Sequence, residues 1–143
     1  MGWEKVKKIL GQSDHELIEV YFHGMSKEAW TQLFDWASDK LIVVDCHHGR
    51  LEKSEFKLEP FLNDEMFYSI DVRMPNNEVL VLGVLDQAEL TIDVEKCEID
   101  TEESFTSFLK NIELIAQITG CEDYIICPEF KKGEAFIHNG QYC

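Results

Sequence analysis

Hydrophobic and polar residues alternate along several segments of the chain, which is the pattern of a β-strand with one buried face. Three such runs follow one another between Met66 and Glu95, separated by the turn sequences Pro75-Asn76-Asn77-Glu78 and Asp86-Gln87. These runs predict an antiparallel three-stranded meander with one face in water. The middle run, Val79 to Leu85, is almost wholly apolar, so we expect it to be a buried strand.

Four further segments show strand patterns, two before the meander and two after it. They are Glu16–Phe22, Leu41–Asp45, Tyr124–Cys127 and Ala135–His138. The charged stretch between Arg50 and Glu65 is weakly strand-like around Leu51–Leu58 and is interrupted by Pro60. This stretch is therefore expected to be a connection between the second strand and the meander.

Apolar residues spaced three and four apart predict three helices. These are the segments from Trp3 to Gly11, from Ser26 to about Lys40 and from Thr101 to Gly120. The third has the clearest boundaries, because Thr is favoured at the N-cap and Gly at the residue that ends a helix. Two acidic residues in its first turn, Glu102 and Glu103, also interact favourably with the helix dipole.

The order of these elements predicts an α+β fold. Helices must cover one face of a mainly antiparallel sheet whose centre is the three-stranded meander. The length of 143 residues is typical of one domain, and no repeat or linker divides the chain, so residues 1–143 are expected to form a single domain. Such an architecture indicates no particular function.

The charge is strongly negative. The chain has 28 Asp and Glu residues against 13 Lys and Arg residues, which gives a formal net charge of −15. This charge repels phosphate backbones, so nucleic-acid binding is disfavoured. It accelerates encounters with a basic protein, which is the partner we expect. The alternative is that the acidity only keeps the protein soluble.

One acidic cluster lies between the end of the meander and the start of the third helix. Its members fall within fifteen residues that contain a single base, Lys96. They are the expected partner-binding residues Glu89, Asp93, Glu95, Glu98, Asp100, Glu102 and Glu103. A strand and a helix N-terminus can hold several of these carboxylates on one rigid side. The alternative is that helix caps and exposed strand faces are acidic for local reasons.

The segment Asp45-Cys46-His47-His48 contains the most reactive group of side chains. Because strand residues alternate between faces, Cys46 and His48 are expected on one side and His47 on the other. A rival interpretation is therefore a small thiol- or metal-dependent enzyme centred on Cys46 and His48. Zinc sites need three or four ligands, and no zinc, nucleotide-binding or hydrolase motif is present. We expect no catalytic residues, no metal and no cofactor.

The cysteines and the apolar segments indicate the compartment. The chain has five cysteines, an odd number, and no secretory signal, so we expect free thiols in the reducing cytoplasm. No apolar stretch is long enough to span a bilayer, and membrane association is not expected.

In its size, acidity, free cysteines and mixed order of elements, the chain resembles the small acidic immunity proteins of bacterial contact-dependent inhibition and other polymorphic toxin systems. The resemblance covers the whole chain and includes no diagnostic motif, so it assigns no role to a numbered residue. It implies a cytoplasmic, non-enzymatic inhibitor that binds a toxin domain, often a basic nuclease. Such an inhibitor covers or distorts the active site of the toxin by direct contact.

Overall fold

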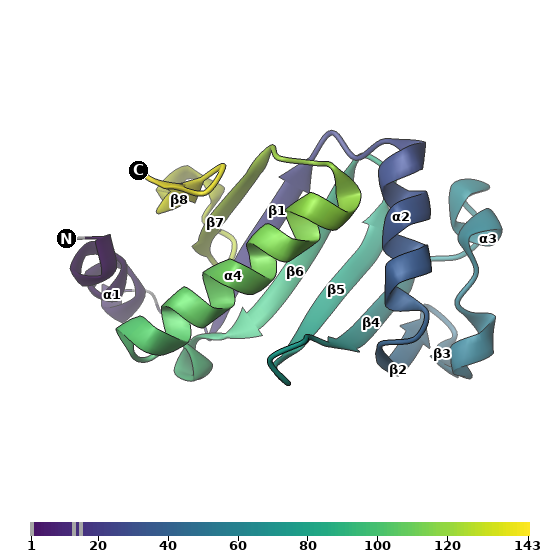
Figure 1. Ribbon diagram of the computed structural model, residues 1–143, viewed down its shortest axis with the longest axis horizontal. Coiled ribbons are helices and arrows are strands. Elements are labelled where there is room, and N and C mark those ends of the chain that lie inside the picture. The colour runs from purple at the N-terminus through teal and green to yellow at the C-terminus, as the bar shows by residue number, and fades with distance from the viewer. Residues whose placement is uncertain (1, 13, 15) are drawn as a thin grey trace.

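The computed structural model describes residues 2–12, 14 and 16–143, which form one antiparallel sheet with helices packed on one face (Figure 1). Within this part of the chain the sheet has nine strands in the order β3-β2-β4-β5-β6-β1-β7-β8-β9. The strands are β1 (Leu17–His23), β2 (Leu41–Cys46), β3 (Gly49–Leu51), β4 (Tyr68–Arg73), β5 (Val79–Asp86), β6 (Glu89–Glu95), β7 (Tyr124–Pro128), β8 (Ile137–His138) and β9 (Gln141–Tyr142). The predicted α+β class and the central meander, β4-β5-β6, are confirmed.

Two helices cross the same face of the sheet, as Figure 1 shows. The α-helices are α1 (Gly2–Gln12), α2 (Lys27–Ala37), α3 (Leu58–Leu62) and α4 (Glu102–Thr119), and the 3₁₀ turns are η1 (Lys53–Glu55), η2 (Lys96–Glu98) and η3 (Lys132–Glu134). The helices that cover the sheet are α2 and α4. Over the described residues, no helix has the length and hydrophobicity that crossing a membrane requires.

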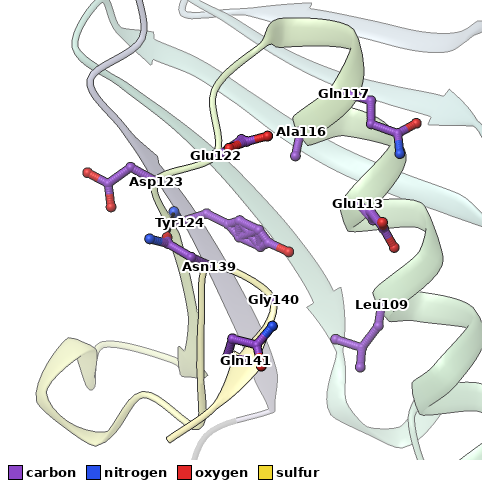
Figure 2. A pocket seen from close by; sticks show the side chains of 10 residues that line it. All are labelled: Leu109, Glu113, Ala116, Gln117, Glu122, Asp123, Tyr124, Asn139, Gly140 and Gln141. Carbon is purple, nitrogen blue, oxygen red and sulfur yellow. Dashed lines mark hydrogen bonds between the residues drawn. The ribbon is translucent and has the colours of Figure 1, made fainter.

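The predicted ends of α4 are confirmed. The Oγ1 atom of Thr101 accepts a hydrogen bond from the backbone N–H of Ser104 at 3.0 Å, and the Ser104 side chain accepts one from the backbone N–H of Thr101. Gly120 ends the helix in the left-handed conformation, with φ of 70°. The chain then returns as β7 and the β8–β9 hairpin, and a cleft remains between this hairpin and α4 (Figure 2).

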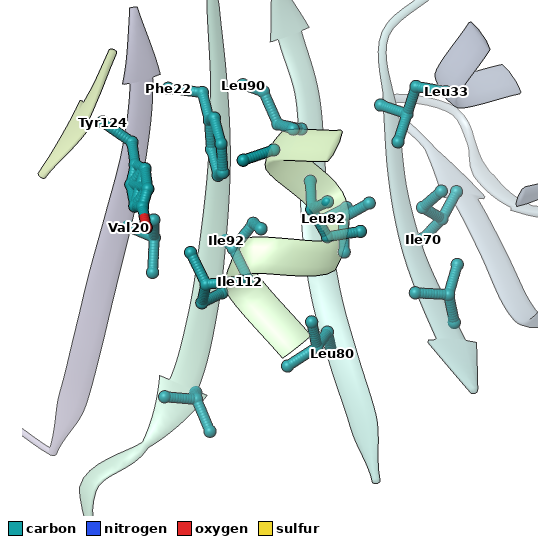
Figure 3. Close-up of a cluster of buried hydrophobic side chains, with 14 of the residues drawn as sticks. Val20, Phe22, Leu33, Ile70, Leu80, Leu82, Leu90, Ile92, Ile112 and Tyr124 are labelled. Carbon is teal, nitrogen blue, oxygen red and sulfur yellow. The ribbon is translucent and has the colours of Figure 1, made fainter. Parts of the chain in front are cut away.

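The core lies between the sheet and the two covering helices. Figure 3 shows Val20, Ile92 and Leu82 of three neighbouring strands with Ile112 of α4. These four side chains are fully buried. Burial of an aliphatic side chain of this size contributes roughly 1.5–3 kcal/mol, so this layer supplies most of the stability of the fold.

The connection after β2 differs from the prediction. Only Gly49–Leu51 is a strand there, and the rest contains η1 and the short helix α3. Pro60 is the third residue of α3, where its missing N–H would have no helical partner. The weakly strand-like interpretation of Leu51–Leu58 is therefore wrong beyond Leu51, and Pro60 lies within a helix because proline is compatible with the first helical turn.

The prediction that the whole Val79–Leu85 run is buried is also wrong. Leu80, Leu82 and Val84 face the helices and are at most 1% exposed. On the opposite side, Val79 is 38% exposed and Leu85 is 56% exposed. The apolar run is therefore covered on one face only, and its other face presents aliphatic side chains to solvent.

Candidate partner-binding surface

The side of the sheet that faces away from α2 and α4, here called the outer face, carries acidic and aliphatic side chains together. One row of directly paired residues crosses it from β2 to β7. In order, this row is Val43, Asp71, Val81, Asp93, Glu19 and Cys127. Within this row Asp71 and Asp93 flank the aliphatic side chain of Val81, and Glu19 follows Asp93.

The loop that follows β7 covers one half of the outer face. The backbone N–H of Phe130 donates to Glu19 Oε1 at 2.7 Å, and the Lys132 ammonium lies 4.1 Å from the centre of the Tyr21 ring. Beneath this loop Glu19, Tyr21 and Cys127 are buried. The outer face thus has a covered half over β1 and β7 and an open half over β4, β5 and β6.

A hollow of about 310 Å³, here called the acidic hollow, lies at one end of the open half. It is lined by Leu17, Val79, Val81, Asp93, Val94, Glu95 and Glu98. Four of the lining residues are apolar and three are acidic, and of these Val79, Val81, Asp93 and Glu95 lie on the outer side of their strands. Such a site fits a cationic side chain with an aliphatic stem, because the stem can contact the apolar residues while the charge meets a carboxylate.

Asp93 has an unusual environment within the acidic hollow. It lies directly opposite Glu19 in the β1–β6 ladder. Burial raises the pKa of Asp93 to about 6, and the negative charges of Glu19 and Glu129 add to this effect. Among residues 2–12, 14 and 16–143, no group donates a hydrogen bond to the buried Asp93 Oδ1 atom.

The structure brings together three of the seven expected partner-binding residues. Asp93, Glu95 and Glu98 line the acidic hollow. Glu89 lies at the other end of β6, about 20 Å away along the strand. Its Oε2 atom is 2.9 Å from His23 Nδ1 and 3.2 Å from Lys132 Nζ, so it already has internal partners.

The other three expected residues lie beyond the acidic hollow. Asp100 lines a different depression, shared with α1. Glu102 and Glu103 are exposed in the first turn of α4. The seven residues therefore extend over several surfaces. That they bind a partner remains a prediction.

Apolar members of this surface were not expected from the sequence. Val79 and Val81 belong to an apolar run that was predicted to be a buried strand, and nothing local distinguishes its exposed side from its buried side. Phe130 is 74% exposed and has a left-handed backbone with φ of 62°. A large aromatic residue held by a loop on the outer face is a typical anchor of protein interfaces. Tyr21, which lies on the same face, is buried beneath this loop.

The Asp45-Cys46-His47-His48 segment forms the β2–β3 hairpin. Strand β2 ends at Cys46, so the expected alternation does not extend to the histidines, and the His47 and His48 rings lie 4.0 Å apart. The expectation that they point to opposite sides is therefore wrong. The backbone N–H of His48 donates to Cys46 Sγ at 3.3 Å. Over the part of the chain that is described, no three His, Cys, Asp or Glu side chains are grouped as a metal site.

No protein-family model and no curated protein sequence matches this chain. A solved structure is similar in fold: one chain of the crystal structure of the toxic C-terminal tip of CdiA from Pseudomonas aeruginosa in complex with its immune protein. The TM-score is 0.59 and the sequence identity is 15%, over 90% of this chain and 97% of that one. The chain thus has the fold of a component of a contact-dependent inhibition complex, in agreement with the resemblance expected from its sequence.

Proposed function

We propose that this protein is an immunity protein, a non-enzymatic cytoplasmic inhibitor that binds a basic toxin domain by direct contact. The observation that carries the proposal is the acidic hollow at one end of the open half of the outer face, which is lined by three acidic and four apolar residues. The likeness in fold to a component of a toxin and immune-protein complex supports a toxin as the partner.

The charge supports the inhibitory role over the toxic one. A toxin that cleaves nucleic acid must attract phosphate groups, whereas a chain with a net charge of −15 repels them. The same charge attracts the basic active-site surface of a nuclease and accelerates its association. We therefore infer that the toxin is basic and that its nucleic-acid-binding surface is the region covered.

In this proposal, charged and apolar residues contribute to different properties of the complex. Exposed carboxylates such as Glu95 and Glu98 steer the encounter and set its orientation. Desolvated contacts with Val79, Val81 and Phe130 supply most of the affinity, because a few buried apolar or aromatic residues dominate most interfaces. The open half of the outer face offers carboxylates beside Val79 and Val81, and Phe130 lies on the loop of the covered half.

The test is co-expression and co-purification with the product of the neighbouring reading frame, followed by association kinetics. The expected result is a one-to-one complex whose association rate falls about tenfold or more between low and high salt. Glu95→Lys with Glu98→Lys should slow association by about tenfold, because both side chains then repel a basic partner.

The matched control is Glu28→Lys. Glu28 is an exposed acidic residue in α2, on the other side of the sheet, and its reversal changes the net charge in the same direction. Association with this variant should stay within about twofold of the unmodified protein. A complex indifferent to salt, or equally weakened by Glu28→Lys, would contradict the acidic hollow as the docking site.

A further inference from the structure

A second acidic cleft lies on the helix side of the molecule, away from the acidic hollow. It occupies about 680 Å³ between α4 and the C-terminal hairpin (Figure 2). One wall is a stripe of α4 that includes Leu109, Glu113 and Gln117, and the opposite wall includes Glu122 and Gln141. The side chains of Glu113, Gln117, Glu122 and Gln141 are exposed, so they are available to a ligand.

Tyr124 forms the base of this cleft. The residue is only 6% exposed, and Figure 2 shows its ring crossing from β7 towards α4 with the hydroxyl group directed into the cleft. Within residues 2–12, 14 and 16–143, the Tyr124 hydroxyl group has no hydrogen-bond partner. A Cβ atom at Gly140 would lie 3.3 Å from this oxygen, so glycine keeps the approach to it open. A buried side chain thus directs an unused polar group at an open space.

The Asp, Glu, Lys and Arg residues that line the cleft are all acidic. Its lining contains the carboxylates of Glu113, Glu122 and Asp123 and no Lys or Arg. Asp123 points away from the centre of the cleft in Figure 2, and its Oδ1 atom is 3.9 Å from His138 Nε2. Burial raises the pKa of Tyr124, and the negative charge of Glu113 adds to this effect.

We propose that this cleft binds a guanidinium group, presented by an arginine side chain of a protein segment or by a free guanidinium compound. Guanidinium is planar and has five N–H donors. The cleft offers acceptors in several directions: two carboxylates on opposite walls, the side-chain amides of Gln117 and Gln141, and the Tyr124 hydroxyl oxygen. Leu109 and Ala116 provide an apolar surface for an aliphatic stem.

The proposal does not depend on the assignment as an immunity protein. The cleft and the acidic hollow share no residue, and they lie on opposite sides of the sheet. Loss of guanidinium binding would leave the toxin complex untouched, and absence of a toxin complex would leave guanidinium binding measurable. The two proposals can therefore fail separately.

The experiment is titration of the ¹⁵N-labelled protein with three probes at low salt, followed by NMR. The probes are acetyl-Gly-Arg-Gly-amide, the matched acetyl-Gly-Gln-Gly-amide and agmatine. Saturable shifts of Gln117, Tyr124 and Gln141 are expected with the two guanidinium probes, with dissociation constants on the order of 1 mM, and none with the Gln peptide. Tighter binding of the Arg peptide identifies a protein segment as the source, and tighter binding of agmatine identifies a free compound.

Substitutions at three exposed positions and one that removes only the hydroxyl group of the buried Tyr124 test the individual contacts. Glu113→Gln with Glu122→Gln should weaken binding of the Arg peptide about tenfold, because charge-assisted hydrogen bonds are lost. Gln117→Lys should abolish it by placing an ammonium group in the cleft. Tyr124→Phe should weaken it about threefold at an unchanged melting temperature.

The control is Glu28→Gln, which removes an exposed carboxylate of α2 and should leave the affinity unchanged. The proposal is overturned if no probe shifts the cleft resonances, or if the Gln peptide binds as well as the Arg peptide. It is also overturned if Gln117→Lys binds normally.

Discussion

The two faces of the sheet are built from the same strands and have opposite roles. Under α2 and α4, neighbouring strands present Val20, Leu82 and Ile92, which are fully buried. One residue along the same strands, the outer face presents Val81 and Asp93, which remain partly open. The comparison teaches that the same strands bury one face against the helices and leave part of the other face open to solvent.

The covered half and the open half of the outer face also differ from each other. Over β1 and β7 the loop that carries Phe130 and Lys132 supplies hydrogen-bond and cation–π partners to Glu19 and Tyr21. Over β5 and β6 no such segment lies above the acidic hollow among the described residues, and Asp93 keeps an oxygen without a donor. On the open half, additional contacts can therefore still lower the free energy of the folded protein.

The largest expected effect is a difference in the free energy of unfolding between substitutions at two adjacent positions of β5, one on each face of the sheet. Leu82→Ala should lower the free energy of unfolding by about 2–5 kcal/mol, because it leaves a cavity between the sheet and the helices. Val81→Ala should lower it by less than about 1 kcal/mol, because Val81 lies on the open half. Urea unfolding of both variants checks this prediction. Equal losses would contradict the distinction between the faces.

The second prediction concerns Asp93 and the pH dependence of stability. Its folded-state pKa of about 6 is above the ordinary value of 3.8, so the folded state binds the proton more tightly than the unfolded state. The contribution of Asp93 is therefore most favourable below pH 4 and is lost as pH rises through 6. Asp93→Asn should raise the free energy of unfolding by about 1–2 kcal/mol at pH 8, with allowance for solvent screening, and by little at pH 3.5.

Urea unfolding from pH 3.5 to 8 measures this difference between Asp93→Asn and the unmodified protein. Glu95→Gln is the matched control, because Glu95 is exposed on the same strand and on the same face. At pH 8 the gain in the free energy of unfolding should be smaller for this variant than for Asp93→Asn, because Glu95 is exposed. An Asp93→Asn difference that does not change with pH would show that the acidic hollow does not penalise the charged carboxylate.

The smallest expected effect concerns the helix that covers the inner face. Thr101→Ala should lower the free energy of unfolding by about 1 kcal/mol, because Thr101 Oγ1 then no longer accepts the Ser104 N–H. Thr106→Ala, at an exposed position inside the same helix, should have little effect or stabilise slightly, since alanine favours helices. Thermal unfolding of the two variants checks the contrast. An equal loss in both would show that the cap is unimportant.

Several elements of the fold were predictable because their signals are local. The alternation in β6 and the caps of α4 at Thr101 and Gly120 depend on residues close together in sequence, and both are confirmed. Helix α3 was missed because its five residues are too few to show a helical period. Strand β9 has two residues and pairs only with β8, so it has no sequence pattern of its own.

The candidate site was predictable only in part, for the same reason. Asp93, Glu95 and Glu98 stand out as acidic residues in one segment, and they share the acidic hollow. Val79 and Leu17, which complete it, come from other strands. The apolar residues of β5 indicate burial on both sides, and only the placement of the helices on one side of the sheet reveals which of them stay exposed.

The sequence by itself determined the α+β class, the meander, the limits of the long helix and the strong negative charge, because each depends on composition or on spacing within a few residues. Only the tertiary structure decided which carboxylates come together, which face of the sheet stays uncovered and how the Tyr124 hydroxyl group meets α4 in the second cleft. These features join residues far apart in the chain, and their proximity follows from sheet order and helix packing.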